Sequence, residues 1–256
     1  MLEMLEERPP VREFARAGRL VVRLARDRRE IEAAQRLRWQ VFSQELGARL
    51  ASGRRGLDED LFDRFCEHLI VEDESTGDVV GTYRILFPEP ARAAGGLYIE
   101  SEFFTDRLRP LKPGLVELGR SCVRRDFRSG AVIMLLWSGL AELLSTSSCR
   151  HVIGCASVPL ADGGHLAATL WRRVWADHAS PEAMRVFPKR RLQIERLGLE
   201  EGVDPVVPPL LKGYLRAGGM LLGDPHIDAE FGCADFPILL ELDRLDARYS
   251  RRFVRP

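Results

Sequence analysis

The chain has 256 residues, with 38 Lys or Arg, 38 Asp or Glu and 45% hydrophobic residues, which is typical of a globular protein with one large or two small domains. Its formal net charge of zero argues against general nucleic-acid binding, because neutralising phosphates requires a basic excess. No uncharged stretch approaches the roughly 20 residues that a membrane-spanning helix needs.

The first half of the chain predicts an extension, a strand, a helix and a hairpin. Residues 1–18 are highly charged and contain Pro9-Pro10, so we expect an N-terminal extension. The start of the chain has no continuous apolar segment, which argues against a secretory signal and favours a cytoplasmic location. Apolar periodicity and turn formers predict a strand at 19–25, a helix at 29–46, and hairpin strands at 68–73 and 79–87.

The second half predicts strands that alternate with helices. No repeat or linker divides the chain, so we expect residues 19–256 to form one domain. Hairpins combined with strand–helix units predict an α+β fold, with a mixed sheet covered by helices on both faces. The expected strands lie at 114–123, 151–158 and 236–245, and the expected helices at 131–144 and 161–175, the latter with Asp162 as N-cap.

Charge is unevenly distributed along the chain. Residues 58–78 contain nine acids and one base, whereas residues 120–191 contain eleven bases and five acids. One interpretation is an acidic and a basic lobe that bind partners of opposite charge. The other is a pair of solvated faces.

Glu117 lies in a mainly apolar predicted strand, where a carboxylate requires a partner or a function. Strict alternation puts Glu117, Gly119 and Ser121 on one face and Arg120 on the other. Burial would raise the pKa of Glu117 and suit it to act as the general base for an amine. The alternative is a structural ion pair with Arg120 or Arg84.

The segment after this strand is basic and leads into a helix. Arg124, Arg125 and Arg128 precede Gly130-Ala131, where the free backbone N–H groups of a helix start can bind phosphate. The alternative interpretation is a basic turn.

Nucleophilic and metal-dependent mechanisms have little support in the sequence. Ser121 and Cys122 lack a Gly-x-Ser-x-Gly motif and a nearby histidine, and the Cys122 thiol is expected to pack in the core. The five cysteines form no Cys-x-x-Cys pair, which favours reduced thiols. The histidines lack ligand spacing, so no metal site is expected.

Four motifs follow one another along the chain: Arg38-x-x-x-Phe42, Asp58-x-Asp60-x-x-Asp63, Gly81-Thr82-Tyr83-Arg84 and Glu117-x-Gly119-Arg120. Together they resemble the motif set of the acyl-homoserine-lactone synthases and their relatives in the GNAT superfamily. The segments at 119–132, 207–245 and 248–253 are similar to the ornithine acyl-ACP N-acyltransferases that make lyso-ornithine lipid. Gly119 favours this lipid branch, because the lactone synthases have serine there.

The resemblance implies a GNAT-like, largely antiparallel sheet and transfer of a fatty or 3-hydroxyacyl group from acyl carrier protein to the α-amine of an amino acid, ornithine first. The phosphopantetheine thioester is then a co-substrate, with no permanently bound cofactor. Acyl carrier protein and the amino acid are the expected partners, nucleic acid is not, and peripheral contact with the inner membrane face is a further expectation. The active-site residues that it implies are Arg38, Phe42, Asp60, Asp63, Arg84, Glu117 and Arg120.

In the expected mechanism, Glu117 accepts a proton from the ammonium, the amine attacks the thioester, and backbone N–H groups near Ser121 and Cys122 hold the oxyanion. The helix at 131–144 either lines the acyl tunnel or packs in the core. Two charged groups would bind substrates: Asp58, Asp60 and Asp63 the cationic acceptor, and Arg124, Arg125 and Arg128, with Gly130 and Ala131, the phosphopantetheine phosphate or the carrier protein. A competing account has the aspartates pair with Arg38 and Arg84 and only shape the site.

Three other functions are open: a coenzyme A-dependent N-acetyltransferase, a lactone synthase, and a non-catalytic module that binds acyl carrier protein. Arg128 stands where the GNAT pyrophosphate loop normally has glycine, which argues against coenzyme A. Many GNAT enzymes protonate the leaving thiolate with a tyrosine on the helix after the fifth strand. Residues 162–176 contain no tyrosine, so the sequence does not identify this proton donor.

Overall fold

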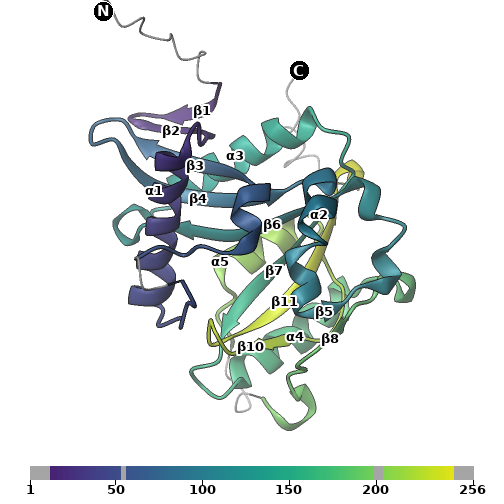
Figure 1. The fold of residues 1–256 in the computed structure, drawn as a ribbon. Coiled ribbons are helices and arrows are strands. Elements are labelled where there is room, and N and C mark those ends of the chain that lie inside the picture. The colour runs from purple at the N-terminus through teal and green to yellow at the C-terminus, as the bar shows by residue number, and fades with distance from the viewer. Residues whose placement is uncertain (1–11, 53–55, 199–203, 245–256) are drawn as a thin grey trace, which may run out of the picture.

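A nine-stranded mixed sheet runs through the molecule (Figure 1). The computed structural model describes residues 12–52, 56–198 and 204–244. The strand order is β1-β2-β3-β4-β6-β7-β11-β10, and β9 also pairs with β11. Only the β6–β7 pair is parallel in the described part of this sheet, which confirms the predicted α+β fold. The strands are β1 (Glu13–Ala17), β2 (Leu20–Leu24), β3 (Glu67–Asp73), β4 (Asp78–Leu86), β6 (Leu115–Val123), β7 (His151–Pro159), β9 (Met220–Leu221), β10 (His226–Asp228) and β11 (Cys233–Glu241).

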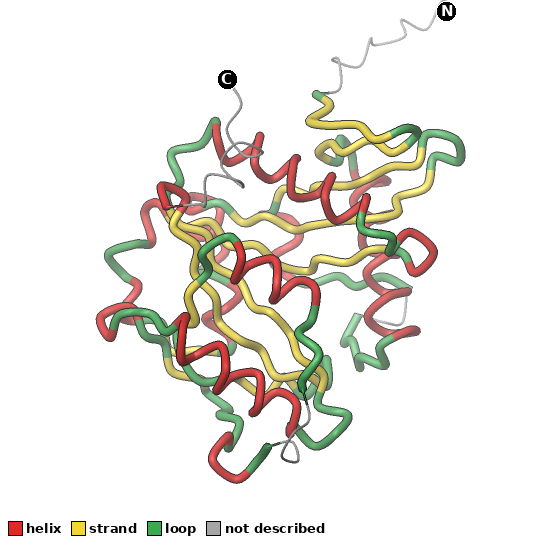
Figure 2. The backbone as a smooth tube through the Cα atoms, turned by 180° about the vertical axis from the view of Figure 1, so that it is seen from behind, coloured by secondary structure: helices red, strands yellow, loops and turns green. Residues whose placement is uncertain are grey.

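Helices cover both faces of the sheet, as predicted (Figures 1 and 2). The first face carries α1, which continues into a π-helical turn, and α2; the opposite face carries α3, α4 and α5. Close packing of α3 requires glycine on the sheet, because a Cβ atom at Gly81 would lie 2.4 Å from the Val132 side chain. The helices are α1 (Arg28–Trp39), the π-helical turn (Gln40–Glu45), α2 (Pro88–Ala94), α3 (Ala131–Ser145), α4 (His165–His178) and α5 (Pro209–Arg216).

Several elements differ from the sequence prediction. The segment predicted as an extension includes β1, which pairs with β2 at the sheet edge. The helix expected at 161–175 begins at His165, because Asp162 accepts hydrogen bonds from the N–H groups of Gly164 and Leu166 and holds a preceding turn. The two- or three-residue strands β9, β10, β5 (Phe103–Phe104) and β8 (Phe187–Pro188) are too short to give a periodic pattern. Residues 248–253, part of the family resemblance, lie outside the described residues.

The sheet opens between β6 and β7. Their parallel pairing covers only Leu115–Glu117 of β6 against 151–153 of β7. The pairing of β6 with β4 on its other side also shifts in register between Thr82 and Arg84. At this bulge Arg120 has φ 50°, a left-handed conformation that costs a non-glycine residue roughly 1–2 kcal/mol. The opening and the bulge together position the residues described next.

Candidate active site

A cavity of about 130 Å³ lies where β6 and β7 separate. Its walls include Phe42 from the α1 side of the sheet and Leu210 of α5 from the other side, so the cavity crosses the sheet. Of the predicted site residues, five line it: Phe42, Arg84, Glu117, Arg120 and Ser121. Alternation along β6 predicted Arg120 on the face opposite Glu117. That expectation was wrong, because the bulge lets both side chains reach the cavity.

Glu117 is 5% exposed and holds a neighbouring turn in place. Its two carboxylate oxygens accept hydrogen bonds from the backbone N–H groups of Tyr98 at 2.6 Å and Ile99 at 2.7 Å. Burial raises the pKa of Glu117 to about 7, although the two N–H groups and the positive charge of Arg84 act in the opposite direction. No arginine of the described residues pairs with this carboxylate within 4 Å, so the predicted structural ion pair is not formed. The group can therefore exchange a proton near neutral pH.

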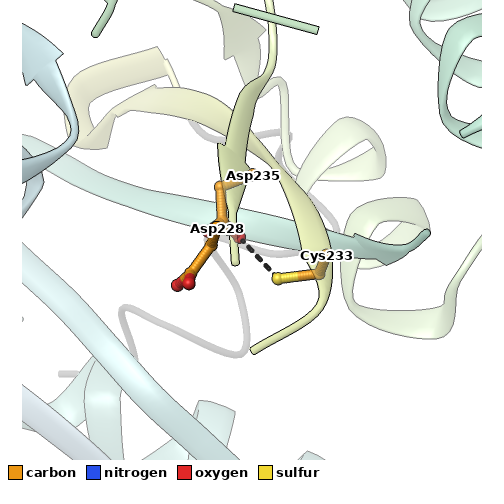
Figure 3. A group of neighbouring side chains, drawn as sticks. All are labelled: Asp228, Cys233 and Asp235. Carbon is orange, nitrogen blue, oxygen red and sulfur yellow. Dashed lines mark hydrogen bonds between the residues drawn. The ribbon is translucent and has the colours of Figure 1, made fainter. Parts of the chain in front are cut away.

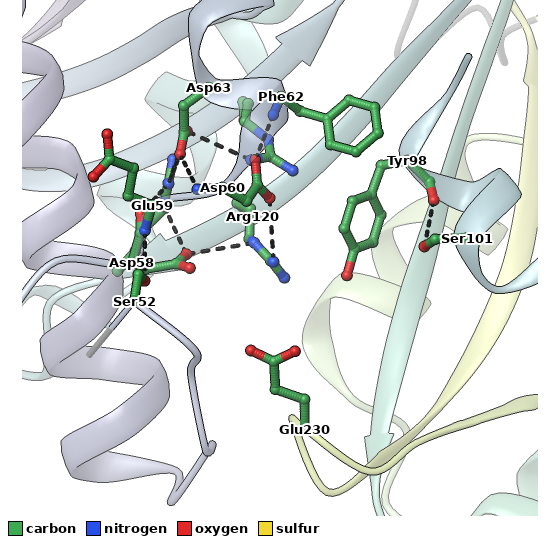
Figure 4. Close-up of polar contacts among 12 residues, drawn as sticks. Ser52, Asp58, Glu59, Asp60, Phe62, Asp63, Tyr98, Ser101, Arg120 and Glu230 are labelled. Atoms are coloured by element: carbon green, nitrogen blue, oxygen red, sulfur yellow. Dashed lines mark hydrogen bonds and ion pairs between the residues drawn. The ribbon is translucent and has the colours of Figure 1, made fainter. Parts of the chain in front are cut away.

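Three aspartates and three arginines form a network beside the cavity (Figure 4). Arg38, which is fully buried, donates to Asp58 at 2.9 Å and to Asp63 at 2.8 Å. Burial by itself raises the pKa of Asp63, but Arg38 and Arg84 outweigh it and hold this pKa below its usual value. Arg84 also pairs with Asp60, at 2.7 Å.

Arg120 joins the same network from the cavity side (Figure 4). Its side chain lies 3.4 Å from Asp58 and 3.4 Å from Asp60. Neither Arg38 nor the three aspartates line the cavity, so the charges predicted to face the acceptor are matched inside the protein. This placement favours the competing account, in which the aspartates shape the site.

Aromatic rings pack around Arg120 in the cavity wall. Phe42 packs edge-on against Phe231 with ring centroids 5.4 Å apart, and the Arg120 guanidinium lies 4.5 Å from the Phe231 ring. Tyr98 was not predicted, and its hydroxyl points into the space between Arg120 and Glu230 (Figure 4). Burial raises the pKa of Tyr98, so its hydroxyl stays protonated. The sequence carries no motif that marks this tyrosine.

A second group of carboxylates also lines the cavity and was missed by the sequence analysis. It consists of Glu102, which precedes β5, Asp228 at the end of β10, and Asp235 on β11. Burial and the neighbouring carboxylates raise the pKa of both Glu102 and Asp235. No sequence motif links these three positions, since only the pairing of β10 with β11 and the packing of the β5 turn bring them together.

Asp228, Cys233 and Asp235 are also the one group among the described residues that could hold a metal ion (Figure 3). Their possible ligand atoms all lie within 4.8 Å of one another. Burial and the Asp235 charge raise the pKa of the Cys233 thiol, which donates to Asp235 at 3.7 Å. A protonated thiol is a poor metal ligand, because the thiolate is the binding form.

The basic segment before α3 differs from the expected phosphate loop. Arg124 pairs with Asp78 at 3.0 Å and with Asp126, and Arg128 pairs with Glu45 at 2.7 Å. Arg125 is exposed and has no ion pair with another described residue. Gly130 adopts φ 102° as the N-cap of α3, which begins at Ala131. The Cys122 thiol packs with Leu37 and Val41 away from the cavity, and burial raises its pKa to about 12.

The fold is that of a GNAT-type acyltransferase. The acetyltransferase (GNAT) domain family matches residues 37–138. FeeM, an N-acyl amino acid synthase from uncultured soil microbes, has a TM-score of 0.55 and 12% identity, with coverage of 90% of this chain and 95% of FeeM. The CoA-dependent acyl-homoserine lactone synthase BjaI has a TM-score of 0.53 and 17% identity, with coverage of 90% and 84%.

Sequence relatives identify the family within this class. The L-ornithine N(alpha)-acyltransferase of Brucella abortus (strain 2308) is 37% identical, with coverage of 92% of this chain and 89% of the relative. The L-ornithine N(alpha)-acyltransferase of Rhodobacter capsulatus is 34% identical, with coverage of 91% and 94%. The chain belongs to the L-ornithine N(alpha)-acyltransferase family. No helix in the described ranges has the length and apolar character needed to cross a bilayer.

Proposed function

We propose that the protein transfers a fatty or 3-hydroxyacyl group from acyl carrier protein to the α-amine of ornithine, in the synthesis of lyso-ornithine lipid. The names of the relatives support the acceptor. The observation that carries the proposal is Glu117, a buried carboxyl on the cavity wall whose pKa is raised to about 7. A base with this pKa matches the requirement for deprotonating an ammonium at neutral pH.

The reaction is a direct transfer. Glu117 accepts a proton from the α-ammonium, directly or through water, and the free amine attacks the thioester carbonyl. The carbonyl π electrons move to oxygen, and their return expels the phosphopantetheine thiolate. The attacking nitrogen loses its second proton as the amide forms, and this proton goes to the leaving thiolate. We assign the oxyanion to backbone N–H groups near Ser121, because Arg120 and Ser121 have no partner in the pairing of β6 with β4.

The opening between the strands suits the donor. Beyond Glu117, β6 no longer pairs with β7, so an extended phosphopantetheine arm can add hydrogen bonds between them as an extra strand does. A second, apolar cavity shares Tyr83 and Leu118 with the first and is walled by Trp137, Leu140 and Leu144 of α3. We propose that the acyl chain extends toward this side, which agrees with the expected role of the 131–144 helix in lining an acyl tunnel.

The test compares the Glu117→Gln variant with the wild type, using acyl-carrier-protein thioester and ornithine. We expect kcat to fall about 10²-fold or more, because the amide cannot accept the proton. In the wild type, kcat/KM should rise with pH through about 7, as the carboxyl ionises.

The control concerns the fold, since the amide NH₂ group introduced by Glu117→Gln would face the N–H of Tyr98 or Ile99. Circular dichroism therefore has to match the wild type before the rates are compared. Wild-type kcat in a folded variant, or a flat pH profile, would exclude Glu117 as the base.

A further inference from the structure

The cavity is lined by charged groups of both signs. Arg84 and Arg120 are the cations of its wall, and Glu102, Asp228 and Asp235 are carboxyl groups, with Glu117 also on the wall. We refer to these three carboxylates as the unpaired triad. Lysine and arginine side chains of the described residues form no ion pair with any of the three, whereas every aspartate of the Arg38 network has at least one such partner.

Within the unpaired triad, Glu102 gives the strongest indication of a cationic ligand. It is 6% exposed and lines the cavity. The Cys155 thiol, 3.8 Å from Oε2, is the only hydrogen-bond partner of its carboxyl group in the part of the chain that the structure describes. Without a cation nearby such a buried carboxyl group stays protonated, and a cationic ligand would supply the partner that its ionised form lacks.

The other two members present oxygen atoms to the same space. Asp235 is 4% exposed and accepts from the Ser157 hydroxyl at 2.6 Å and from the Cys233 thiol. Asp228 accepts through Oδ1 from the N–H groups of Glu230 and Phe231, and its other oxygen has no described donor. Both are therefore oriented by neutral donors and form no ion pair with a described lysine or arginine, although the charge of Arg120 acts on Asp235 from a greater distance.

We propose that the unpaired triad binds the side-chain ammonium of a diamino-acid acceptor and thereby selects ornithine over neutral amino acids. The inference rests on the proposed function and identifies the subsite that binds the substrate's second amine. An ammonium carries three N–H donors on one positive charge, so three carboxylates can satisfy both its hydrogen bonds and its charge.

Arg120 suits the acceptor's carboxylate. It lines the cavity, and its contacts with Asp58 and Asp60, both at 3.4 Å, are longer than normal charge-assisted hydrogen bonds, so its guanidinium can still donate to a bound carboxylate. With the α-carboxylate at Arg120 and the side-chain ammonium at the unpaired triad, the α-amine is directed to the part of the wall that carries Glu117. The raised pKa of Glu102 agrees with this arrangement, since like-charged neighbours keep it protonated until a cation arrives.

The experiment measures kcat/KM for ornithine and for norvaline, which has the same carbon chain without the second amine. We expect Glu102→Gln and Asp235→Asn to lower the ratio of kcat/KM for ornithine to kcat/KM for norvaline about 10-fold or more. The kcat/KM for norvaline should change by less than about threefold. The matched control is Asp106→Asn, which removes an exposed carboxylate from the turn after β5 and should keep the wild-type ratio. Asp228→Asn replaces either variant that fails to fold.

The possible outcomes separate the two proposals. A wild type that acylates neither acceptor overturns the proposed function. A wild type that uses norvaline as well as ornithine, or variants that lose both acceptors equally, overturns the inference alone. Loss of wild-type activity in a chelator, with recovery on adding Zn²⁺, would show instead that the triad holds a metal ion, and would also overturn it.

Discussion

Two acidic groups flank one cavity, and they differ in whether their charge is matched inside the protein. Asp58, Asp60 and Asp63 are dense in the sequence, yet three arginines hold them away from the cavity. The unpaired triad is dispersed in the sequence, yet it lines the cavity and has no cationic partner among the described residues. The comparison shows that a high density of charges in the sequence does not decide which charges line the cavity, because ion pairs inside the fold match the first group and not the second.

The largest expected effect is on the free energy of unfolding, through the ion-pair network of Arg38. Arg38→Met leaves the buried Asp58 and Asp63 without their main partner, so we expect a loss of about 3–5 kcal/mol in the free energy of unfolding. Denaturant unfolding measures it, with Arg36→Met on the exposed face of the same helix as the matched control, expected within about 0.5 kcal/mol of the wild type. Equal midpoints for Arg38→Met and the wild type would show that the network does not stabilise the fold.

The next prediction distinguishes a structural role of Asp63 from a role in binding the acceptor. Asp63→Asn weakens the ion pairs with Arg38 and Arg84, and we expect it to cost about 1–3 kcal/mol of stability. Because Asp63 does not line the cavity, ornithine and norvaline should lose activity in the same proportion. Parallel unfolding and steady-state assays test this. A rise in KM for ornithine but not for norvaline would show that Asp63 takes part in binding the acceptor.

The stability of the protein should fall with rising pH because of Glu102 in the unpaired triad. Burial and neighbouring carboxylates raise the pKa of Glu102 to about 9, above the ordinary carboxyl value of 4.5. The stabilisation from its protonated form is thus complete below about pH 4.5 and is lost as pH rises through 9.

The free energy of unfolding should therefore fall from pH 5 to 9 less steeply in Glu102→Gln than in the wild type. The difference in slope is at most about 1.4 kcal/mol per pH unit. Urea titrations at several pH values measure it, and taking the difference between the two proteins removes the titrating groups that do not interact with Glu102. Identical slopes would mean that Glu102 is ionised in the folded protein.

The smallest expected effect concerns a paired and an unpaired arginine on the protein surface. Arg124 is paired with Asp78 and Asp126, whereas Arg125 is exposed and unpaired among the described residues. If the donor is an acidic carrier protein, Arg125→Glu should lower kcat/KM by several-fold at low salt, more than Arg124→Glu does, and added salt should narrow the difference. Acyl-CoA, assayed in parallel, should be a poor donor; equal use of it without any salt effect would exclude the carrier-protein proposal.

The sequence by itself determined the elements with long apolar periods and the identity of the candidate base. The β3–β4 hairpin and α3 follow from local patterns, because repeated side-chain spacing defines a strand or a helix without distant contacts. Glu117 stands out for the same reason, since a carboxylate interrupts a mainly apolar strand. The ordered motifs also identified the family, which the relatives confirm.

Only the tertiary structure decided which charges face the cavity. Arg38 meets partners 20 and 25 positions away, and Asp235 comes near Glu102 because the turn before β5 contacts β7, which pairs with β11. The bulge that turns Arg120 into the cavity likewise depends on its register against β4. Ion pairing and strand register are long-range properties, and so the sequence placed the acceptor's charge at Asp58, Asp60 and Asp63, whereas the fold leaves the unmatched carboxylates at Glu102, Asp228 and Asp235.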